Sequence, residues 1–221
     1  QVLQKLRHKN IVHFVGYKKL VSKTSVEFFL FMELFEKPCS LKGVIQKKLN
    51  RQMKFGYAEW FSFDEVKKFI TQMAEGLQYL HQNRIAHRDL KTANILVRTQ
   101  TSLKVRSVHI ADFGLATDAT VNAMASTVTG TPCYMAPEVL AKEKYDPFKA
   151  DIWSFGIVVY EILTWREPSV VGKRPEFPPD RIFTDERFAG ILELFESCTE
   201  LQPRDRPTAS EILQMCNFLQ F

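Results

Sequence analysis

The stretch from His87 to Asn94 carries the densest set of reactive side chains in this sequence. It reads His-Arg-Asp-Leu-Lys-Thr-Ala-Asn, so that an acid, two cationic side chains, a histidine and an amide stand within eight positions. Asp89 could accept a proton from a hydroxyl nucleophile, and Lys91 could neutralise phosphate charge. Asn94 could offer its amide oxygen to a magnesium ion. Taken alone, the same residues would fit an ordinary polar connection between a helix and a strand equally well.

The elements around this stretch are suited to holding it in place. Ser62 and Glu65 have the spacing of a capping box and predict the start of a helix. Apolar residues then repeat at intervals of three and four, which predicts a helix lying on a core; they are Val66, Phe69, Ile70, Met73, Leu77 and Leu80. Short strands are expected afterwards at Ile95–Arg98 and Val108–Ile110. A loop fixed at both ends in this way can hold its side chains in defined orientations.

The N-terminal part of the chain predicts strands followed by a short helix. The spacing of Val2, Leu3 and Leu6 is helical. Strands are expected at Ile11–Tyr17 and Val26–Leu34, and the second is so continuously apolar that we expect it to be buried. A short helix should run from Leu41 into Asn50.

The C-terminal part predicts helices after an irregular segment. Residues 115–130 are rich in Ala, Ser and Thr without a clear period, which indicates a loop. Residues Ala150–Trp165 are apolar nearly all round, so this helix should be buried. Amphipathic helices are expected at Asp185–Cys198 and Thr208–Leu219, the latter opened by a second capping box.

The composition limits the classes of function that the chain can have. Its 221 residues are enough for one large domain, and the net charge is a mild +5. Lys and Arg are scattered rather than grouped with aromatic residues, which argues against nucleic-acid binding. The cysteines form no C-x-x-C pair, so we expect neither a zinc site nor a disulfide framework, and a reduced, cytoplasmic setting. No apolar run is long enough to span a membrane. The sequence does not indicate an oligomeric state.

Further blocks follow the first in a specific order. Asp112-Phe113-Gly114, Ala136-Pro137-Glu138 and Asp151–Gly156 come after the stretch that ends at Asn94. Together these blocks resemble the catalytic domain of eukaryotic protein kinases, over essentially the whole chain. The type is similar to Ser/Thr kinases, and the run Gly130–Ala136 is similar to the tyrosine-kinase-like group.

The resemblance implies an α+β, protein-kinase-like fold. Residues 1–35 would form a remnant of the N-terminal lobe with its antiparallel sheet and the hinge. Residues 36–221 would form the mostly helical C-terminal lobe, which holds the catalytic loop and the activation segment. The partners implied are ATP, Mg²⁺ and a protein substrate.

The resemblance also assigns catalytic and metal-binding roles. Asp89 would orient the substrate hydroxyl and accept its proton, and Lys91 would lie near the transferred phosphoryl group. Asn94 and Asp112 would hold magnesium ions and so contact the nucleotide. Thr131 would brace Asp89 and Lys91.

Other residues match the kinase hinge and the contacts that support the active site. Met32 takes the gatekeeper position, Glu33 and Phe35 would bond adenine through their backbone, and Leu96 would cap it from below; the plain alternative is an apolar strand and a core leucine. Glu138 and Arg206 match an ion pair that ties the activation segment to the helical lobe. The stacked regulatory spine, with Asp151 at its base, matches Leu3, Phe14, His87 and Phe113.

Some kinase features are missing from the sequence. It contains no G-x-G-x-x-G loop and no V-A-I-K lysine, and it begins at Gln1, so we interpret it as a fragment that is inactive by itself. Only Ser169–Val171 remain where kinases usually place a substrate-docking helix.

The alternatives are a non-catalytic scaffold of kinase fold and a small-molecule kinase, the latter disfavoured by Ala136-Pro137-Glu138. For regulation, a phosphate near Arg88 is expected at one of Thr117, Thr120, Ser126, Thr127 and Thr129, with Thr127 and Thr129 preferred.

Overall fold

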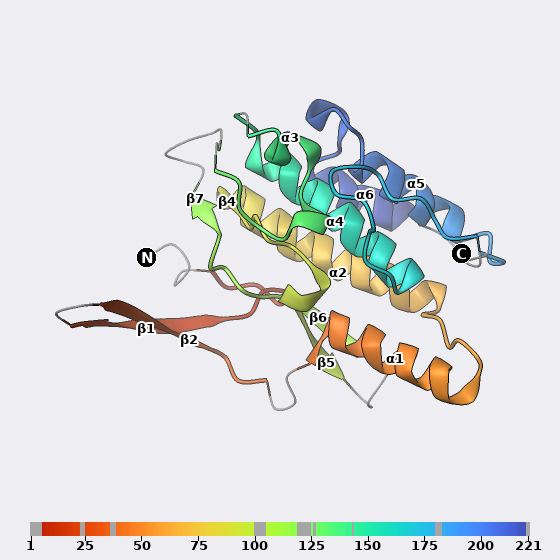
Figure 1. Ribbon diagram of the computed structural model, residues 1–221, viewed down its shortest axis with the longest axis horizontal. Coiled ribbons are helices and arrows are strands. Elements are labelled where there is room, and N and C mark those ends of the chain that lie inside the picture. Colours follow the sequence, from red (N-terminus) through yellow and green to blue (C-terminus); the bar gives the residue numbers. More distant parts are fainter. Residues whose placement is uncertain are drawn as a thin grey trace.

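The computed structural model describes residues 6–22, 25–35, 39–99, 105–118, 125, 127–142, 144–179 and 183–219. A body of helices makes up most of it, and a two-stranded hairpin projects from one end (Figure 1). The helix predicted around Leu3 lies outside the described residues.

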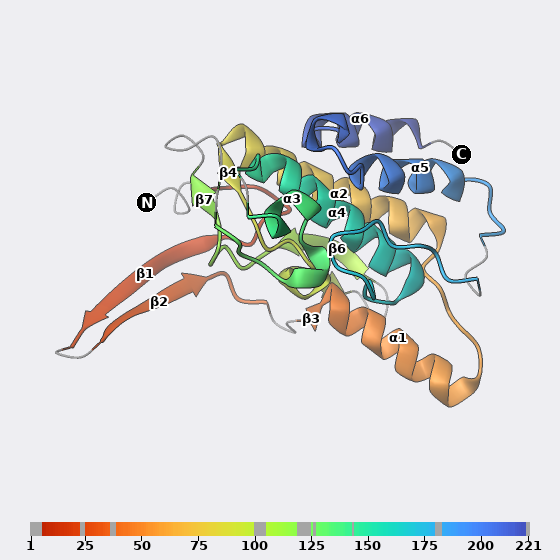
Figure 2. The same ribbon diagram turned by 45° about the horizontal axis from the view of Figure 1, so that its top comes forward.

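Two long helices form the centre of the body. Helix α2, Phe63–Gln82, runs beside α4, Pro147–Thr164 (Figure 2). Helix α5, Phe188–Cys198, packs against α4, and α6, Ala209–Phe218, packs against α2. Helix α4 is buried along almost its whole length, because its apolar residues cover every side and neighbouring elements surround it.

Helix ends follow the capping residues. The predicted capping boxes are both present, Ser62 with Glu65 and Thr208 with Glu211. Helix α4 begins earlier than predicted, because the side chain of Asp146 caps it and Pro147 fits its first turn.

Other helix ends differ from the prediction. Helix α1, Leu41–Phe55, continues beyond the predicted end at Asn50 until Gly56, whose φ of 77° closes it. Helix α5 begins three positions after the predicted start at Asp185, since residues 185–187 form a turn instead.

Short strands and helical turns surround the stretch that ends at Asn94. Strands β5, Ile95–Thr99, and β6, Val105–Ile110, are antiparallel and correspond to the predicted pair, with β6 beginning three residues before the predicted start at Val108. Two-residue strands were not predicted, because they are too short to show a period; they are β3, Cys39–Ser40, β4, Ile85–Ala86, and β7, Thr117–Asp118. Single turns are also present: η2, Thr92–Asn94, η3, Pro132–Tyr134, α3, Pro137–Leu140, and η4, Pro203–Asp205.

The hairpin corrects two predictions. It consists of β1, Phe14–Val21, and β2, Val26–Met32. Strand β1 starts later than predicted, because Ile11 forms a bridge with Ile110 of β6 instead. The prediction that the second strand is buried was wrong: Leu30 and Phe31 are 51% and 50% exposed. Apolar sequence favours burial, but only neighbouring strands or helices can supply it, and among the described residues β2 pairs with β1 alone.

In the described part of the chain, no helix combines the length and apolarity needed to cross a membrane.

Candidate active site

The stretch after α2 is fixed by a buried carboxylate. The backbone N–H groups of His87 and Arg88 each donate to Asp151 of α4 over 2.8 Å. The Asp151 side chain is fully buried and also contacts Nε2 of His81 at 3.0 Å. Arg88 has a φ of 65°, a conformation that is unfavourable for a residue with a side chain. The two hydrogen bonds to Asp151 hold the loop in this conformation, which supports the predicted anchoring role of Asp151.

Asp89 stands at the centre of a closed set of hydrogen bonds. Lys91 Nζ donates to Asp89 Oδ2 over 2.7 Å and to Thr131 Oγ1 over 2.7 Å. Thr131 Oγ1 donates in turn to Asp89 Oδ1 over 2.8 Å. The predicted bracing of Asp89 and Lys91 by Thr131 is therefore present in the geometry. Both carboxylate oxygens have fixed positions before any ligand binds.

Asn94 is oriented by the same aspartate. Its Nδ2 donates to the backbone oxygen of Asp89 over 2.9 Å and to Oδ2 over 3.1 Å. Since both donated bonds come from the nitrogen, Oδ1 points away from Asp89 and is left as an acceptor. A hard cation such as Mg²⁺ prefers an oxygen ligand of this kind.

His87 links this loop to the segment that contains Asp112. The N–H of Asp89 donates to His87 Nδ1 over 3.3 Å, so Nε2 carries the proton and donates to the Ala111 oxygen at 2.9 Å. The His87 and Phe113 rings lie 5.4 Å apart at 61°. They meet edge to face, which corrects the predicted stacking. His87 therefore serves as a buried connection and has no free nitrogen for proton transfer.

Asp112 lies two positions after the end of β6 at Ile110, and its side chain faces solvent. Its φ is 61°, and its Oδ1 accepts from the Gly114 N–H over 3.3 Å. The neighbouring Ala111 N–H donates to the Asn94 backbone oxygen over 2.9 Å, which brings the ends of the two segments together. Asp112 and Asn94 thus provide an exposed carboxylate and an amide oxygen, a donor set that fits a magnesium ion shared with phosphate oxygens. The described residues contain no cluster of three or more His, Cys, Asp or Glu that could hold a metal without such a partner.

Gly130 allows the activation segment, which lies between Asp112 and Glu138, to approach Asp89. Its φ is 118°, and an added Cβ would lie 2.7 Å from the Arg88 oxygen and 3.7 Å from Asp89 Oδ1. A side chain at this position would be strained and would collide with backbone. The glycine therefore permits Thr131, the next residue, to reach Asp89. A narrow hollow lined by Asp89, Thr131 and Tyr134 lies beside this contact.

The predicted ion pair between Glu138 and Arg206 is present and has two parallel contacts. Nη1 and Nη2 of Arg206 lie 2.6 and 2.8 Å from the two carboxylate oxygens of Glu138. The Arg206 side chain is fully buried and lies over the Trp153 ring at 5.0 Å. The short helix α3, which contains Glu138, is thereby tied to the helical body.

A second buried network was not predicted from the sequence. Glu161 Oε2 accepts from Thr92 Oγ1 over 2.8 Å and also from the Tyr134 hydroxyl. Burial raises the pKa of Glu161 and of Tyr134 above their ordinary values. Since Thr92 belongs to the catalytic stretch and Tyr134 to η3, Glu161 joins both segments to α4. The position of Glu161 within the otherwise apolar run Ile157–Leu163 was the signal that could have identified it.

The predicted hinge residues are placed less directly. Phe35 is buried beside Val12 and Ala111, and Leu96 packs against this small cluster. The Glu33 carboxylate accepts from the His13 N–H over 2.9 Å and pairs with Arg98 at 2.8 Å. The structure thus brings Phe35 and Leu96 together, but it leaves their roles toward adenine as predictions.

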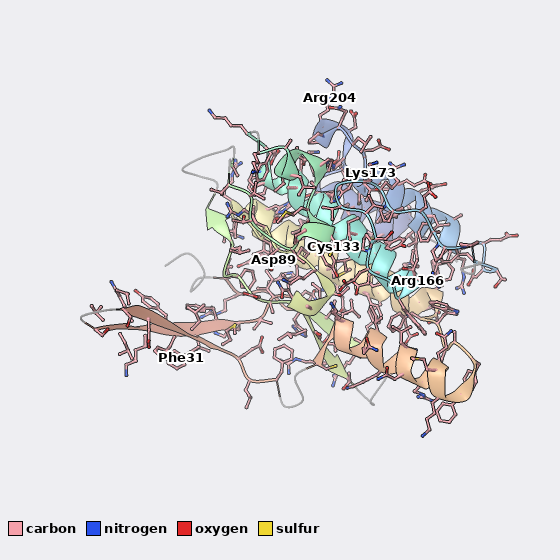
Figure 3. The ribbon with its side chains drawn as sticks, in the orientation of Figure 1. Phe31, Asp89, Cys133, Arg166, Lys173 and Arg204 are labelled. Carbon is pink, nitrogen blue, oxygen red and sulfur yellow. The ribbon has the colours of Figure 1, made fainter. Side chains whose placement is uncertain are left out.

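The structure describes some of the residues predicted for the gatekeeper position and the regulatory spine. Met32 is 48% exposed at the end of β2, and Phe14 is buried. Leu3 lies outside the described residues. Figure 3 shows Phe31, a neighbour of Met32, out on the hairpin and away from Asp89.

The chain belongs to the protein kinase domain family, whose model matches residues 1–218. It is 33% identical to serine/threonine-protein kinase STY17 of Arabidopsis thaliana, with 99% of this chain and 36% of the relative covered. It is 32% identical to mitogen-activated protein kinase kinase kinase zak-1 of Caenorhabditis elegans, covering 96% of this chain and 28% of that protein. The kinase and exchange factor for Rac B of Dictyostelium discoideum is 32% identical, with 96% and 19% covered. The chain thus spans about a third or less of these relatives.

Proposed function

We propose that this chain is the catalytic lobe of a protein serine/threonine kinase, which transfers the γ-phosphoryl group of ATP to Ser or Thr hydroxyls of a protein. The observation that carries the proposal is the set of hydrogen bonds that joins Asp89, Lys91, Thr131 and Asn94. Phosphoryl transfer through a loose transition state needs positioned charges more than a strong base. Relatives named serine/threonine-protein kinases support the same reaction.

In this proposal Asp89 orients the acceptor hydroxyl and takes its proton late in the reaction. Its carboxylate is held at both oxygens, so that it does not need to reorganise when the substrate arrives. The Lys91 side chain is only 22% exposed, so its positive charge stays next to Asp89 instead of extending into solvent. Thr131 sets the distance between these two side chains and connects them to the segment where a peptide would lie.

When bound, ATP would supply the phosphoryl group that is transferred, and Mg²⁺ would neutralise part of the phosphate charge. Asn94 Oδ1 and the Asp112 carboxylate would hold the metal. The backbone of Glu33 and Phe35 would bind adenine, and Leu96 would lie under it. We propose that residues 1–35 belong to the N-terminal lobe with the hinge and 36–221 to the C-terminal lobe. The four cysteines are free, which supports a cytoplasmic setting.

The alternative is a kinase-fold scaffold that acts through its surfaces. A scaffold has no need of Asp89, Asn94 and Asp112 together, yet all three are present. A small-molecule kinase is disfavoured because the segment Ala136-Pro137-Glu138 resembles the one that shapes the peptide-binding surface of protein kinases.

Replacement of Asp89 by Asn in the full-length protein tests the proposal. We expect the rate of ³²P transfer from ATP to a protein substrate to fall by at least about 10²-fold, because positioning and proton acceptance are lost together. Nucleotide affinity, measured by calorimetry, should stay nearly unchanged. Asp64→Asn is the matched control, since the Asp64 side chain is 77% exposed. A kcat for Asp89→Asn within about threefold of wild type would overturn the assignment.

A further inference from the structure

The last turn of helix α1 and the residues that follow it carry large apolar side chains on the surface. Met53, Phe55 and Tyr57 are 83%, 52% and 60% exposed, and the rings of Phe55 and Tyr57 lie 6.3 Å apart. These side chains belong to the α1 tip, residues 51–57, which lies at the outer margin of the body on the side away from the hairpin (Figure 1, Figure 2). Grouped apolar side chains at a surface indicate an interaction site.

The α1 tip is also positively charged. Residues 51–57 contain Arg51 and Lys54 but no Asp or Glu. Lys54 Nζ lies 5.2 Å from the centre of the Phe55 ring, a contact that leaves its charge unneutralised. Arg51 approaches the Glu59 carboxylate only to 3.8 Å, beyond hydrogen-bond distance, and both side chains are about half exposed. A pair of this kind is weak, so both cations of the tip are available to an anionic partner.

The size of the tip favours a lipid surface over a protein partner. A fully buried aromatic side chain covers about 150–250 Å², and Phe55 and Tyr57 are only a little more than half exposed. Together with Met53 they fall short of the roughly 800 Å² that each partner contributes to a standard protein interface. A bilayer needs no matching pocket: it takes up apolar side chains at the level of its headgroups, while basic residues contact anionic lipids.

The backbone of the tip is better suited to lipid than that of the hairpin, which also exposes apolar side chains. The N–H group of Gly56 donates to the Gln52 oxygen over 2.8 Å and closes the helix. In the described part of the chain, β1 and β2 pair only with each other, so the outer edge of each strand presents backbone groups without a strand partner. Such groups are costly in an apolar layer. The tip can therefore enter the lipid surface more readily than the hairpin can.

We propose that the α1 tip binds the surface of a membrane that contains anionic lipids. Met53, Phe55 and Tyr57 would enter the boundary between headgroups and acyl chains. Arg51 and Lys54 would contact the lipid phosphates, because their long side chains allow the charges to stay among the headgroups. The tip lies away from Asp89, so that contact with a membrane leaves the catalytic loop accessible (Figure 3).

Vesicle flotation with the wild-type chain tests this proposal. The vesicles contain phosphatidylcholine with about 30% phosphatidylserine, which supplies the anionic surface, or phosphatidylcholine alone. Bound protein rises with the vesicles in a density gradient, whereas any aggregated protein sinks. We expect binding to the anionic vesicles only, and a decrease of at least about fivefold when the salt concentration rises from about 0.1 M to about 0.5 M.

A double variant tests the apolar contact. Phe55→Ser with Tyr57→Ser should weaken binding to the anionic vesicles at least about tenfold, because it removes the aromatic rings that enter the lipid. Phe29→Ser with Phe31→Ser is the matched control, since these hairpin side chains are 46% and 50% exposed. This control should change binding less than about twofold.

A second double variant tests the charges. Arg51→Glu with Lys54→Glu should weaken binding at least about tenfold, since it replaces attraction to the anionic lipids by repulsion. Lys173→Glu with Arg204→Glu is the matched control: both residues are exposed and lie away from α1 in Figure 3. It changes the net charge equally but should weaken binding less than about threefold.

The circular dichroism spectra of all variants should match that of the wild type, so that a loss of binding reports the surface and not the fold. Equal losses for the tip variants and their controls would show unspecific adsorption and overturn the proposal. So would equal binding to vesicles with and without phosphatidylserine, or no binding of the wild-type chain to either.

Discussion

Thr127 is the residue of the activation segment that the structure places best for regulation by phosphorylation. Its side chain is exposed, and Arg88 Nη1 lies 3.4 Å from its Oγ1. Arg88 also donates through Nε to the Leu115 oxygen over 3.0 Å. The Oγ1 of Thr129, by contrast, is buried. A phosphate on Thr127 would therefore reach Arg88 directly, while one on Thr129 would require the segment to move.

We expect Thr127 to carry phosphate in the active full-length protein. The phosphate would pair with Arg88 and order the segment between Asp112 and Glu138. Thr127→Ala should lower kcat at least about tenfold, whereas Ser197→Ala, on the far helix α5, should not. Mass spectrometry of active protein that finds no phosphate anywhere in this segment would refute the expectation.

Glu161 gives a prediction for pH dependence. Burial raises its pKa above the ordinary 4.5, so the folded state favours the protonated acid. Its contribution to stability is therefore present at low pH and is lost as the pH rises from 4.5 through the raised folded pKa. Glu161→Gln resembles the protonated form and removes this loss. The melting temperature of the variant relative to wild type should increase from pH 4.5 to pH 8. A difference that stays constant over this range would contradict the prediction.

At the scale of elements, one ion pair holds the activation segment against the helical body. Helix α3 is only four residues long, too short to be stable without outside contacts. The bidentate contact between Glu138 and Arg206 supplies them, and the Arg206 guanidinium also donates to backbone oxygens of Lys149 and Glu200.

Removing one partner of this pair should be costly. We expect Glu138→Gln to lower the free energy of unfolding by about 3–5 kcal/mol, because it leaves the fully buried Arg206 without its counter-charge. Urea unfolding followed by circular dichroism measures the change. Glu193→Gln serves as the control, since Glu193 is exposed on α5 and should change stability by less than about 0.5 kcal/mol. A cost below about 1 kcal/mol for Glu138→Gln would show that the pair is not required.

At the scale of the whole molecule, the projecting hairpin is the least covered part of the described chain. Apolar side chains are about half exposed on both of its strands, including Tyr17 at 50% and Phe29 at 46%. Its outer edges also leave backbone groups open to pairing.

We expect the isolated chain to self-associate through this hairpin. Sedimentation velocity should show oligomers or aggregates for the wild type, and the double change Phe29→Lys and Phe31→Lys should shift the distribution toward monomer. Val170→Lys with Val171→Lys is the control, because these exposed residues lie in a loop of the helical body. A wild-type chain that sediments only as monomer would disprove the expectation.

We also expect the isolated chain to transfer phosphate far more slowly than the full-length protein. Its sequence contains no G-x-G-x-x-G loop and no V-A-I-K lysine to grip the nucleotide phosphates. Phosphates that stay open to water interact weakly with Lys91 and the metal ligands. A ³²P-ATP assay of the two proteins side by side measures the ratio, which should be below about 1%. Comparable rates would show that these elements are not needed.

Local spacing along the chain was sufficient to predict several parts of this protein. The distance from Asp89 to Asn94 is fixed by one short loop, and the capping boxes at Ser62 and Thr208 each span a single helical turn. The all-round apolarity of α4 was enough to predict its burial. The order of the motifs indicated the family, which the match over residues 1–218 confirms.

The tertiary structure alone revealed contacts between distant side chains that neither local spacing nor the family resemblance indicated. Glu161 is 69 positions from Thr92 and 27 from Tyr134, yet its carboxylate accepts hydrogen bonds from both. Sequence periodicity reports which face of one element is apolar, but it contains no information on which element packs against that face. For the same reason the exposure of β2 could not be predicted. Burial depends on the neighbours that the folded chain brings to a surface, and those neighbours come from other parts of the sequence.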